Sequence, residues 1–136
     1  EEEDSLVRAA KIRNLDLIYL AAPTTTDARL ATIGQSTSGY LYYVSLKGIT
    51  GSSKLDTANV KERIEHIRQH VSVPICVGFG IRTAEDAAVI SSTADGSIVG
   101  TVLVSQIEAL VNDTAKIPEA LQSIIKPMRV AMDAIA

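Results

Sequence analysis

The sequence has only one cysteine, Cys76, so an intramolecular disulfide is excluded. A secreted scaffold held by disulfides does not fit this composition, and we expect the chain in the cytosol. The sequence also lacks a basic block, because its formal net charge is -3 and its lysines and arginines are dispersed. Nucleic acid or an anionic membrane would require clustered positive charge, so neither is an expected partner and a small-molecule ligand is favoured.

No apolar run approaches the roughly 20 residues that a membrane-spanning helix needs. Residues 1–4 are all acidic, whereas a signal peptide begins with basic residues. We interpret them as the acidic first turn of a helix rather than as an interaction tail. The sequence does hold 46% hydrophobic residues, which is ample for the core of one domain over residues 1–136.

Four short apolar runs, at residues 15–22, 40–46, 74–77 and 97–99, are nearly continuous in character. Such runs are typical of strands that are buried on both faces of a sheet. The stretches between them have helical spacing, most clearly in the apolar stripe of Val60, Ile64, Ile67 and Val71. Helix-start signals agree, since polar segments at 25–27, 56–57 and 83–86 directly precede helical patterns.

The expected order is a leading helix at about 6–14, then strand and helix repeated, with final helical pieces at 106–111 and 117–135. Pro127 interrupts the last piece, so we expect a kink or a break there. Repeated βα units require parallel strands with crossover helices. The sequence therefore predicts an α/β fold, either half of a closed barrel or a short doubly wound sheet.

Glycines cluster where the predicted strands end, at Gly48 and Gly51, at Gly78 and Gly80, and at Gly100. In parallel α/β folds, ligands bind at the carboxyl ends of strands, and glycine lets the backbone approach a phosphate closely. Phosphate also binds at helix N-termini, and each of these loops leads into a helix. The alternative is that each is an ordinary turn glycine, but three in phase with the strands favour one shared phosphate site.

The motifs occur in a specific order: LIYLAAPTT at 17–25, YYVS at 42–45, GITG at 48–51, PICVGFGI at 74–81 and ADGSIVG at 94–100. This order resembles the tryptophan synthase α-subunit family along the whole chain. The resemblance implies a TIM barrel that cleaves indole-3-glycerol phosphate to indole and glyceraldehyde 3-phosphate, with no cofactor, and passes the indole to a β subunit. It implies that this chain is the C-terminal half, with strands five to eight and their helices.

The resemblance carries site residues onto matching positions of this sequence. The implied phosphate-binding residues are Gly51, Gly80, Gly100 and Thr101, and the implied indole pocket is formed by Leu20, Tyr42 and Phe79. Thr50 corresponds to a supporting loop residue that hydrogen-bonds the catalytic aspartate. The family's catalytic glutamate and aspartate lie on the second and third strands, so we expect no catalytic residue in this chain and no activity from it alone. Thr101 stands where the family usually has serine, so its methyl group crowds that contact.

Several residues invite a functional reading that we do not adopt. His66 and His70 are four apart on the central helix, but no further ligand is evident, so we expect a solvated helix face and no metal. Cys76 lies in a buried type of strand and is expected to be core. Asp16 and Asp95 open strands at the end opposite the ligand face, where barrel residues serve stability.

Two rival functions remain beside the family enzyme. Another phosphate-binding barrel lyase or isomerase should differ at 21–25 and 48–51. A non-catalytic phosphate-binding half-barrel, or a module that binds the β subunit, is the second rival. Because a half-barrel leaves two strand edges and its inner face uncovered, we also expect self-association or pairing with the missing N-terminal half.

Overall fold

The computed structural model describes residues 2–45, 57–78 and 80–135 of the chain. The helices are α1 (Glu2–Ile12), α2 (Asp27–Ser36), α3 (Thr57–Ile67), α4 (Ala84–Ser91), α5 (Thr101–Ala109) and α6 (Ile117–Asp133), with a short 3-10 helix, η1 (Thr114–Lys116), before the last. The strands are β1 (Tyr19–Ala21), β2 (Leu41–Val44), β3 (Ile75–Gly78) and β4 (Gly96–Ile98). Strand and helix alternate after α1, as the sequence predicts.

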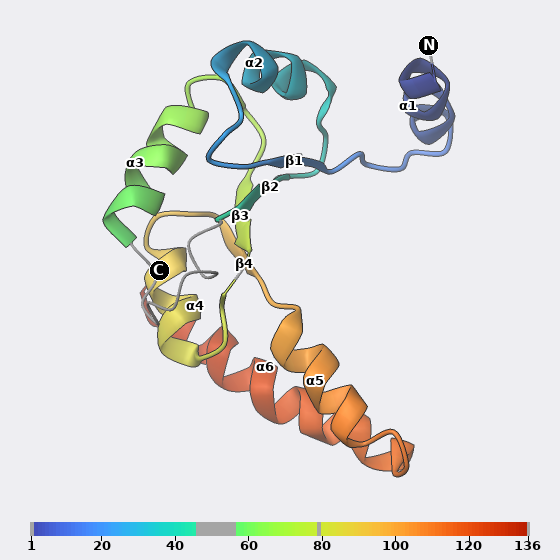
Figure 1. Cartoon of the computed structure of the whole chain (residues 1–136), viewed down its shortest axis with the longest axis vertical. Coiled ribbons are helices and arrows are strands. Elements are labelled where there is room, and N and C mark those ends of the chain that lie inside the picture. The colour runs from blue at the N-terminus through green and yellow to red at the C-terminus, as the bar shows by residue number, and fades with distance from the viewer. Residues whose placement is uncertain (1, 46–56, 79, 136) are drawn as a thin grey trace.

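The strands pair in parallel and in sequence order, β1-β2-β3-β4. Helices α2, α3 and α4 follow one another around one side of this sheet (Figure 1). A doubly wound sheet would place helices on both faces and reverse its strand order at a switch point. Sequential order with helices on one face is instead the arrangement of a barrel wall.

The core lies between the sheet and these helices. Every second strand residue faces it, namely Ala21 on β1, Leu41 and Tyr43 on β2, and Ile75 and Val77 on β3, and each is almost fully buried. The predicted stripe of α3 packs against them, with Val60, Ile64, Ile67 and Val71 all buried. Burying each such side chain contributes about 1.5–3 kcal/mol, so the core specifies which face of each element turns inward.

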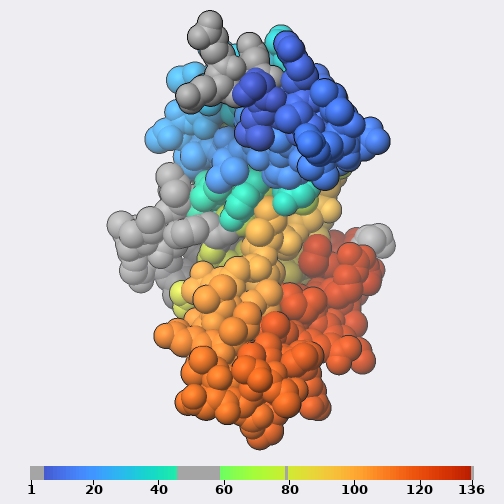
Figure 2. All heavy atoms as spheres, turned by 90° about the vertical axis from the view of Figure 1, so that its right-hand side faces the viewer, coloured from blue at the N-terminus to red at the C-terminus, as the bar shows by residue number. Residues whose placement is uncertain are grey.

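Among the residues that the structure describes, few pack on the opposite face of the sheet. The register places Leu20, Tyr42, Cys76 and Gly96 side by side on it. Leu20 is 59% exposed, and Tyr42 and Cys76 are half-buried. Figure 2 looks from this side, and turquoise atoms of the segment around β2 are open to the viewer between the N-terminal part and α5. In a closed barrel this face would be the interior.

Local signals place the helix starts as predicted. Thr26 caps α2, and its side chain accepts a hydrogen bond from the Arg29 backbone N–H. At α4 a full capping box forms, because Thr83 accepts from the Asp86 backbone N–H while the Asp86 carboxylate accepts from that of Thr83. Each cap satisfies backbone donors that a helix start otherwise leaves unpaired.

Of the kink or break predicted at Pro127, the break is wrong, because α6 runs through that residue as one helix. Proline removes one helical hydrogen bond, but Met128 is buried and Ile124 and Met132 pack against the core on either side. That packing holds both halves in one helix. Helix α1 begins at Glu2, which confirms the interpretation of the acidic N-terminal residues as a first helical turn and extends the helix predicted at about 6–14 toward the N-terminus. The start of α5 differs, since this helix begins at Thr101, five residues before the predicted start.

Among the residues that the structure describes, no helix combines the length and apolar character needed to cross a bilayer.

Candidate functional site at the carboxyl ends of the strands

The described site residues lie in the loops that follow β3 and β4 and on strands β1 and β2. Gly80 follows β3, and Gly100 and Thr101 follow β4, which is hydrogen-bonded to β3. Leu20 and Tyr42 are register partners on the uncovered face of β1 and β2. Thr50, Gly51 and Phe79 lie outside the described residues. The structure thus brings five of the eight predicted residues to one end and one face of the sheet.

Gly80 has a backbone conformation that favours glycine. Its φ is 83°, in the left-handed region, and the residue is exposed. A side chain there would strain the turn between β3 and α4. The glycine therefore both shapes the loop and leaves its backbone accessible.

Gly100 is the N-cap of α5, and Thr101 is the first residue of that helix. Gly100 supplies no side-chain cap, while its carbonyl accepts from the backbone N–H groups of Leu103 and Val104. An added Cβ at Gly100 would meet no atom within 4 Å, and both residues are exposed. The start of this helix, with its partial positive charge, is therefore open to an anion.

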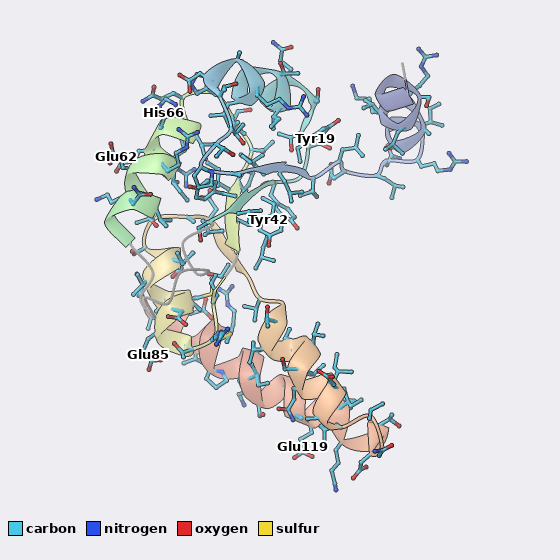
Figure 3. All side chains as sticks on the ribbon, in the orientation of Figure 1. Tyr19, Tyr42, Glu62, His66, Glu85 and Glu119 are labelled. Atoms are coloured by element: carbon cyan, nitrogen blue, oxygen red, sulfur yellow. The ribbon has the colours of Figure 1, made fainter. Side chains whose placement is uncertain are left out.

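Tyr42 lies against the carboxyl end of β3. An ideal Cβ on Gly78 would come within 2.3 Å of the Tyr42 ring, so only glycine lets the ring occupy this position. In Figure 3, Tyr42 lies on the uncovered side of the sheet, below β1. The ring therefore leans along the inner face toward the loop that carries Gly80.

Ser45 fixes the same strand ends and was not singled out from the sequence. Its backbone N–H and its hydroxyl both donate to the Gly78 carbonyl, at 3.2 and 3.3 Å, and the residue is buried. The loop after β1 is held in a similar way, since the Thr25 hydroxyl accepts from the Ala22 N–H and Arg63 donates to the Thr25 carbonyl at 2.6 Å. Arg63 and Thr25 are 38 residues apart, and an arginine on a helix is no sequence signal for this contact.

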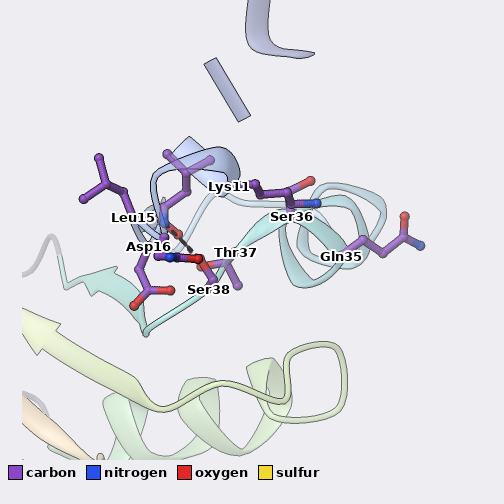
Figure 4. A pocket seen from close by; sticks show the side chains of 9 residues that line it. Lys11, Leu15, Asp16, Gln35, Ser36, Thr37 and Ser38 are labelled. Carbon is purple, nitrogen blue, oxygen red and sulfur yellow. Dashed lines mark hydrogen bonds between the residues drawn. The ribbon is translucent and has the colours of Figure 1, made fainter. Parts of the chain in front are cut away.

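A hollow of about 370 Å³ opens at the other end of the sheet (Figure 4). It is lined by Lys11 and residues 14–17 before β1 and by residues 35–38 before β2. Its polar groups are partly engaged, because Ser38 accepts from the Leu17 N–H and Thr37 donates to the Leu17 carbonyl. This hollow lies at the amino ends of the strands and is separate from the predicted phosphate loops.

The prediction that Cys76 is core is wrong, because its neighbours Ile75 and Val77 face the core and Cys76 lies half-buried on the opposite face of the sheet. Asp95 has structural surroundings, as predicted. Burial, followed by the negative charge of Asp95, raises the pKa of the Cys76 thiol, which opposes a nucleophilic role. The Asp95 carboxylate accepts from the Ile75 backbone N–H and from Arg68, both at 2.8 Å. It thereby joins the start of β3, the start of β4 and the end of α3, away from the ligand edge.

His66 has a partner that the sequence did not reveal. Its Nε2 lies 2.8 Å from Oδ1 of Asp27, at the start of α2, and this hydrogen bond lowers the pKa of Asp27. The His70 ring lies edge-on to that of His66, with 5.2 Å between centroids. The expectation of two isolated histidines on a solvated face is therefore incomplete, because a carboxylate from another helix joins them.

A sequential parallel sheet with helices on one face and glycines at its carboxyl edge defines a TIM-barrel protein, of which this chain forms the C-terminal half. A family model described as tryptophan synthase alpha chain matches residues 1–133. The chain belongs to the tryptophan synthase alpha chain family.

Individual relatives agree with this assignment. The chain is 43% identical to the tryptophan synthase alpha chain of Marinobacter nauticus over 136 residues and 45% identical to that of Nitrosococcus oceani over 134 residues. The crystal structure of tryptophan synthase subunit alpha from Legionella pneumophila superposes with a TM-score of 0.82 at 35% identity, covering 97% of this chain and 48% of that one. The chain spans about half the length of the curated relatives it matches.

Proposed function

We propose that this chain supplies the phosphate site and part of the indole pocket of a lyase that cleaves indole-3-glycerol phosphate to indole and glyceraldehyde 3-phosphate. The proposal is supported by the position of Gly80, with its positive φ, and of the α5 start at Gly100 and Thr101, in the loops that follow the neighbouring strands β3 and β4. Leu20 and Tyr42 form an apolar wall on the adjoining face. Gly51 and Phe79 complete the two proposed subsites.

The proposed reaction divides its chemistry between two groups of residues. Retro-aldol cleavage places a proton on an indole ring carbon while a glycerol hydroxyl loses one, which is work for positioned carboxyl groups. In the family these are a glutamate and an aspartate on strands two and three. No residue of this chain takes either role, and Thr50 is assigned only a supporting one.

The phosphate takes no part in bond breaking. Its binding energy holds the reacting end of the substrate in register, and that contribution does not depend on the acid and base. We therefore infer that the isolated chain retains affinity for a phosphate ester but does not turn substrate over. The proposed partners are indole-3-glycerol phosphate or its phosphate product, a β subunit that receives indole, and a second copy or the N-terminal half.

The alternative is a non-catalytic half-barrel that binds phosphate or docks on a β subunit. The loop at Gly80 and the open start of α5 at Gly100 would serve such a module equally well. Indole release from indole-3-glycerol phosphate separates the two functions. We expect none from the chain alone and recovery when the N-terminal half of a relative's α chain is added; no recovery at saturating N-terminal half would favour the alternative.

The phosphate site is tested by titration with glycerol 3-phosphate, using Gly100→Asp and its neutral match Gly100→Asn. Both side chains have room and both can cap α5, so the helix is kept in each variant. Only Asp places a negative charge at the anion site, where repulsion at close range should weaken binding about tenfold relative to Asn. Equal affinities of the two variants would count against a phosphate at this helix start.

A further inference from the structure

Asp27, His66 and His70, here called the Asp27–His66–His70 cluster, converge on one point between α2 and the end of α3. One ligand atom from each residue lies within 4.8 Å of the other two. The closest pair is His66 Nε2 and Asp27 Oδ1, at 2.8 Å, and the two imidazole rings are inclined by 61°. Figure 3 shows His66 at the end of α3 that lies beside α2.

The backbone brings the two histidines to the same side. His66 lies in the last turn of α3, and helical hydrogen bonds continue beyond it, from Arg68 N–H to the Ile64 carbonyl and from Val71 N–H to the Ile67 carbonyl. Residues four apart in such a turn face the same way. His66 and His70 therefore form a pair that can bind one ion.

Gly34 on α2 allows the Asp27 carboxylate to lie close to the two histidines. An ideal Cβ on Gly34 would lie 2.2 Å from the His70 carbonyl oxygen, so α2 can approach this turn only because residue 34 has no side chain. Asp27 precedes Gly34 by seven residues, or two helical turns, and so lies on the same face of α2. The close approach at Gly34 thereby aligns Asp27 with His66.

We propose that the Asp27–His66–His70 cluster binds a divalent transition-metal ion, with Zn²⁺ as the best match. Two imidazole nitrogens and one carboxylate oxygen form a three-ligand set that suits Zn²⁺ and leaves a fourth position for water. Two imidazoles on one tetrahedral ion, with Zn–N bonds of about 2.1 Å, hold their ring centroids about 5 Å apart. The observed separation is 5.2 Å.

The hydrogen bond within the cluster supports the same conclusion. The His66 nitrogen and the Asp27 oxygen already face each other at 2.8 Å, and a metal ion bound between them would replace the hydrogen-bonding proton. The site is accessible, because the side chains of Asp27 and His66 are 63% and 33% exposed. Arg63, one turn earlier on α3, opposes a cation, but its guanidinium is engaged with the Thr25 carbonyl.

The bound ion would link the first turn of α2 to the end of α3. These helices flank consecutive strands, so the link would stabilise the β1–α2 and α3–β3 junctions against separation. The inference is independent of the proposed lyase function, because the cluster lies on the helical layer and includes none of the proposed substrate-binding residues.

The test is a calorimetric titration of the chain with Zn²⁺, for the unaltered protein and for His66→Gln, His70→Gln and Asp27→Asn. We expect one saturable site, weakened at least about tenfold by each substitution. Glu65→Gln is the matched control, since Glu65 is an exposed carboxylate on α3 outside the cluster, and it should leave affinity unchanged. Co²⁺ in place of Zn²⁺ should give the visible absorption of a tetrahedral ion, lost in the same three variants.

Three outcomes would overturn the proposal. The absence of saturable heat at millimolar Zn²⁺ would mean a surface ion pair only. Unchanged affinity in the double variant His66→Gln/His70→Gln would place the metal elsewhere, for example on Cys76. Unchanged affinity in Asp27→Asn would exclude the three-ligand set. Far-UV circular dichroism of each variant verifies that the fold is retained, as expected for one exposed and two partly exposed side chains.

Discussion

Gly34 on α2 lies against the backbone carbonyl of His70, so a side chain at this position has no room. We predict that Gly34→Ala destabilises the protein by about 1–3 kcal/mol, because the new methyl group would meet the His70 backbone carbonyl, which cannot move as a side chain can. Helix propensity alone predicts the reverse sign, since alanine is the better helix former by about 0.5–1 kcal/mol. Urea unfolding measures the difference.

Gln35→Ala is the control for this prediction. Gln35 is the next residue of α2 and is exposed, so its replacement raises helix propensity without approaching His70. It should leave the free energy of unfolding unchanged or slightly higher. A stabilising Gly34→Ala would show that α2 and the α3–β3 turn are not held at this distance.

Cys76 provides a prediction about pH at the same scale. Its thiol pKa is raised above the ordinary 9.0 by burial and by Asp95, so the folded chain holds this proton more tightly than the unfolded chain does. Alkylation by iodoacetamide should therefore reach half its limiting rate at a higher pH in the folded protein than in urea. Because the pKa of the Cys76 thiol is higher in the folded than in the unfolded chain, the thiol's contribution to the free energy of unfolding is present below pH 9.0. That contribution decreases as the pH rises through the folded pKa.

Replacing Asp95 by Asn separates the two causes of the Cys76 shift. The substitution removes the charge and leaves burial, so the midpoint should fall part of the way toward the value in urea. A folded midpoint equal to that of the unfolded chain in the unaltered protein would contradict the prediction.

At the scale of elements, Asp95 joins two strands and a helix through one carboxylate oxygen. We predict that Asp95→Ala costs about 1–3 kcal/mol, because it leaves the Ile75 backbone N–H without its acceptor. Arg68→Ala removes only the partly exposed ion pair and should cost less than about 1 kcal/mol. Equal losses in denaturant unfolding would mean that the ion pair, rather than the backbone hydrogen bond, carries the stabilisation.

The elements also show which parts of the fold are predictable from sequence. The strands and the helix starts at 25–27 and 83–86 are predictable, because continuous apolar runs and capping side chains act within a few residues. The continuity of α6 through Pro127 is not predictable in this way, because the packing of Met128 and its neighbours outweighs the loss of one hydrogen bond. Such contacts between residues far apart in the sequence cannot be predicted from the local sequence.

The candidate site divides in the same way. The glycines after β3 and β4 were predicted, since their place after a strand is readable from the chain. The contact of the Tyr42 ring with Gly78 depends on the register of two strands, and the meeting of Asp27 with His66 joins residues 39 apart on two helices. Neither contact can be predicted from a sequence pattern, because both depend on how separate elements pack in the folded chain.

For the whole molecule, the main physical question is what covers the inner face of the sheet. On this face Leu20 is 59% exposed beside half-buried Tyr42 and Cys76, and β1 and β4 each have one edge without a partner among the described strands. Unpaired edges and exposed apolar side chains promote association. We therefore predict that the purified chain self-associates, as measured by sedimentation velocity across a range of concentrations.

Leu20→Lys tests whether this face carries the contact. Leu20 already faces away from the core, so its replacement should leave the fold intact, while a buried Leu at a contact contributes about 1.5–3 kcal/mol. The association constant should fall about tenfold or more. Val130→Lys alters an equally exposed residue, 61% accessible on α6, and should have no such effect. A monodisperse monomer at all concentrations would contradict the prediction, and equal losses in both variants would place the contact on the helices instead of the sheet.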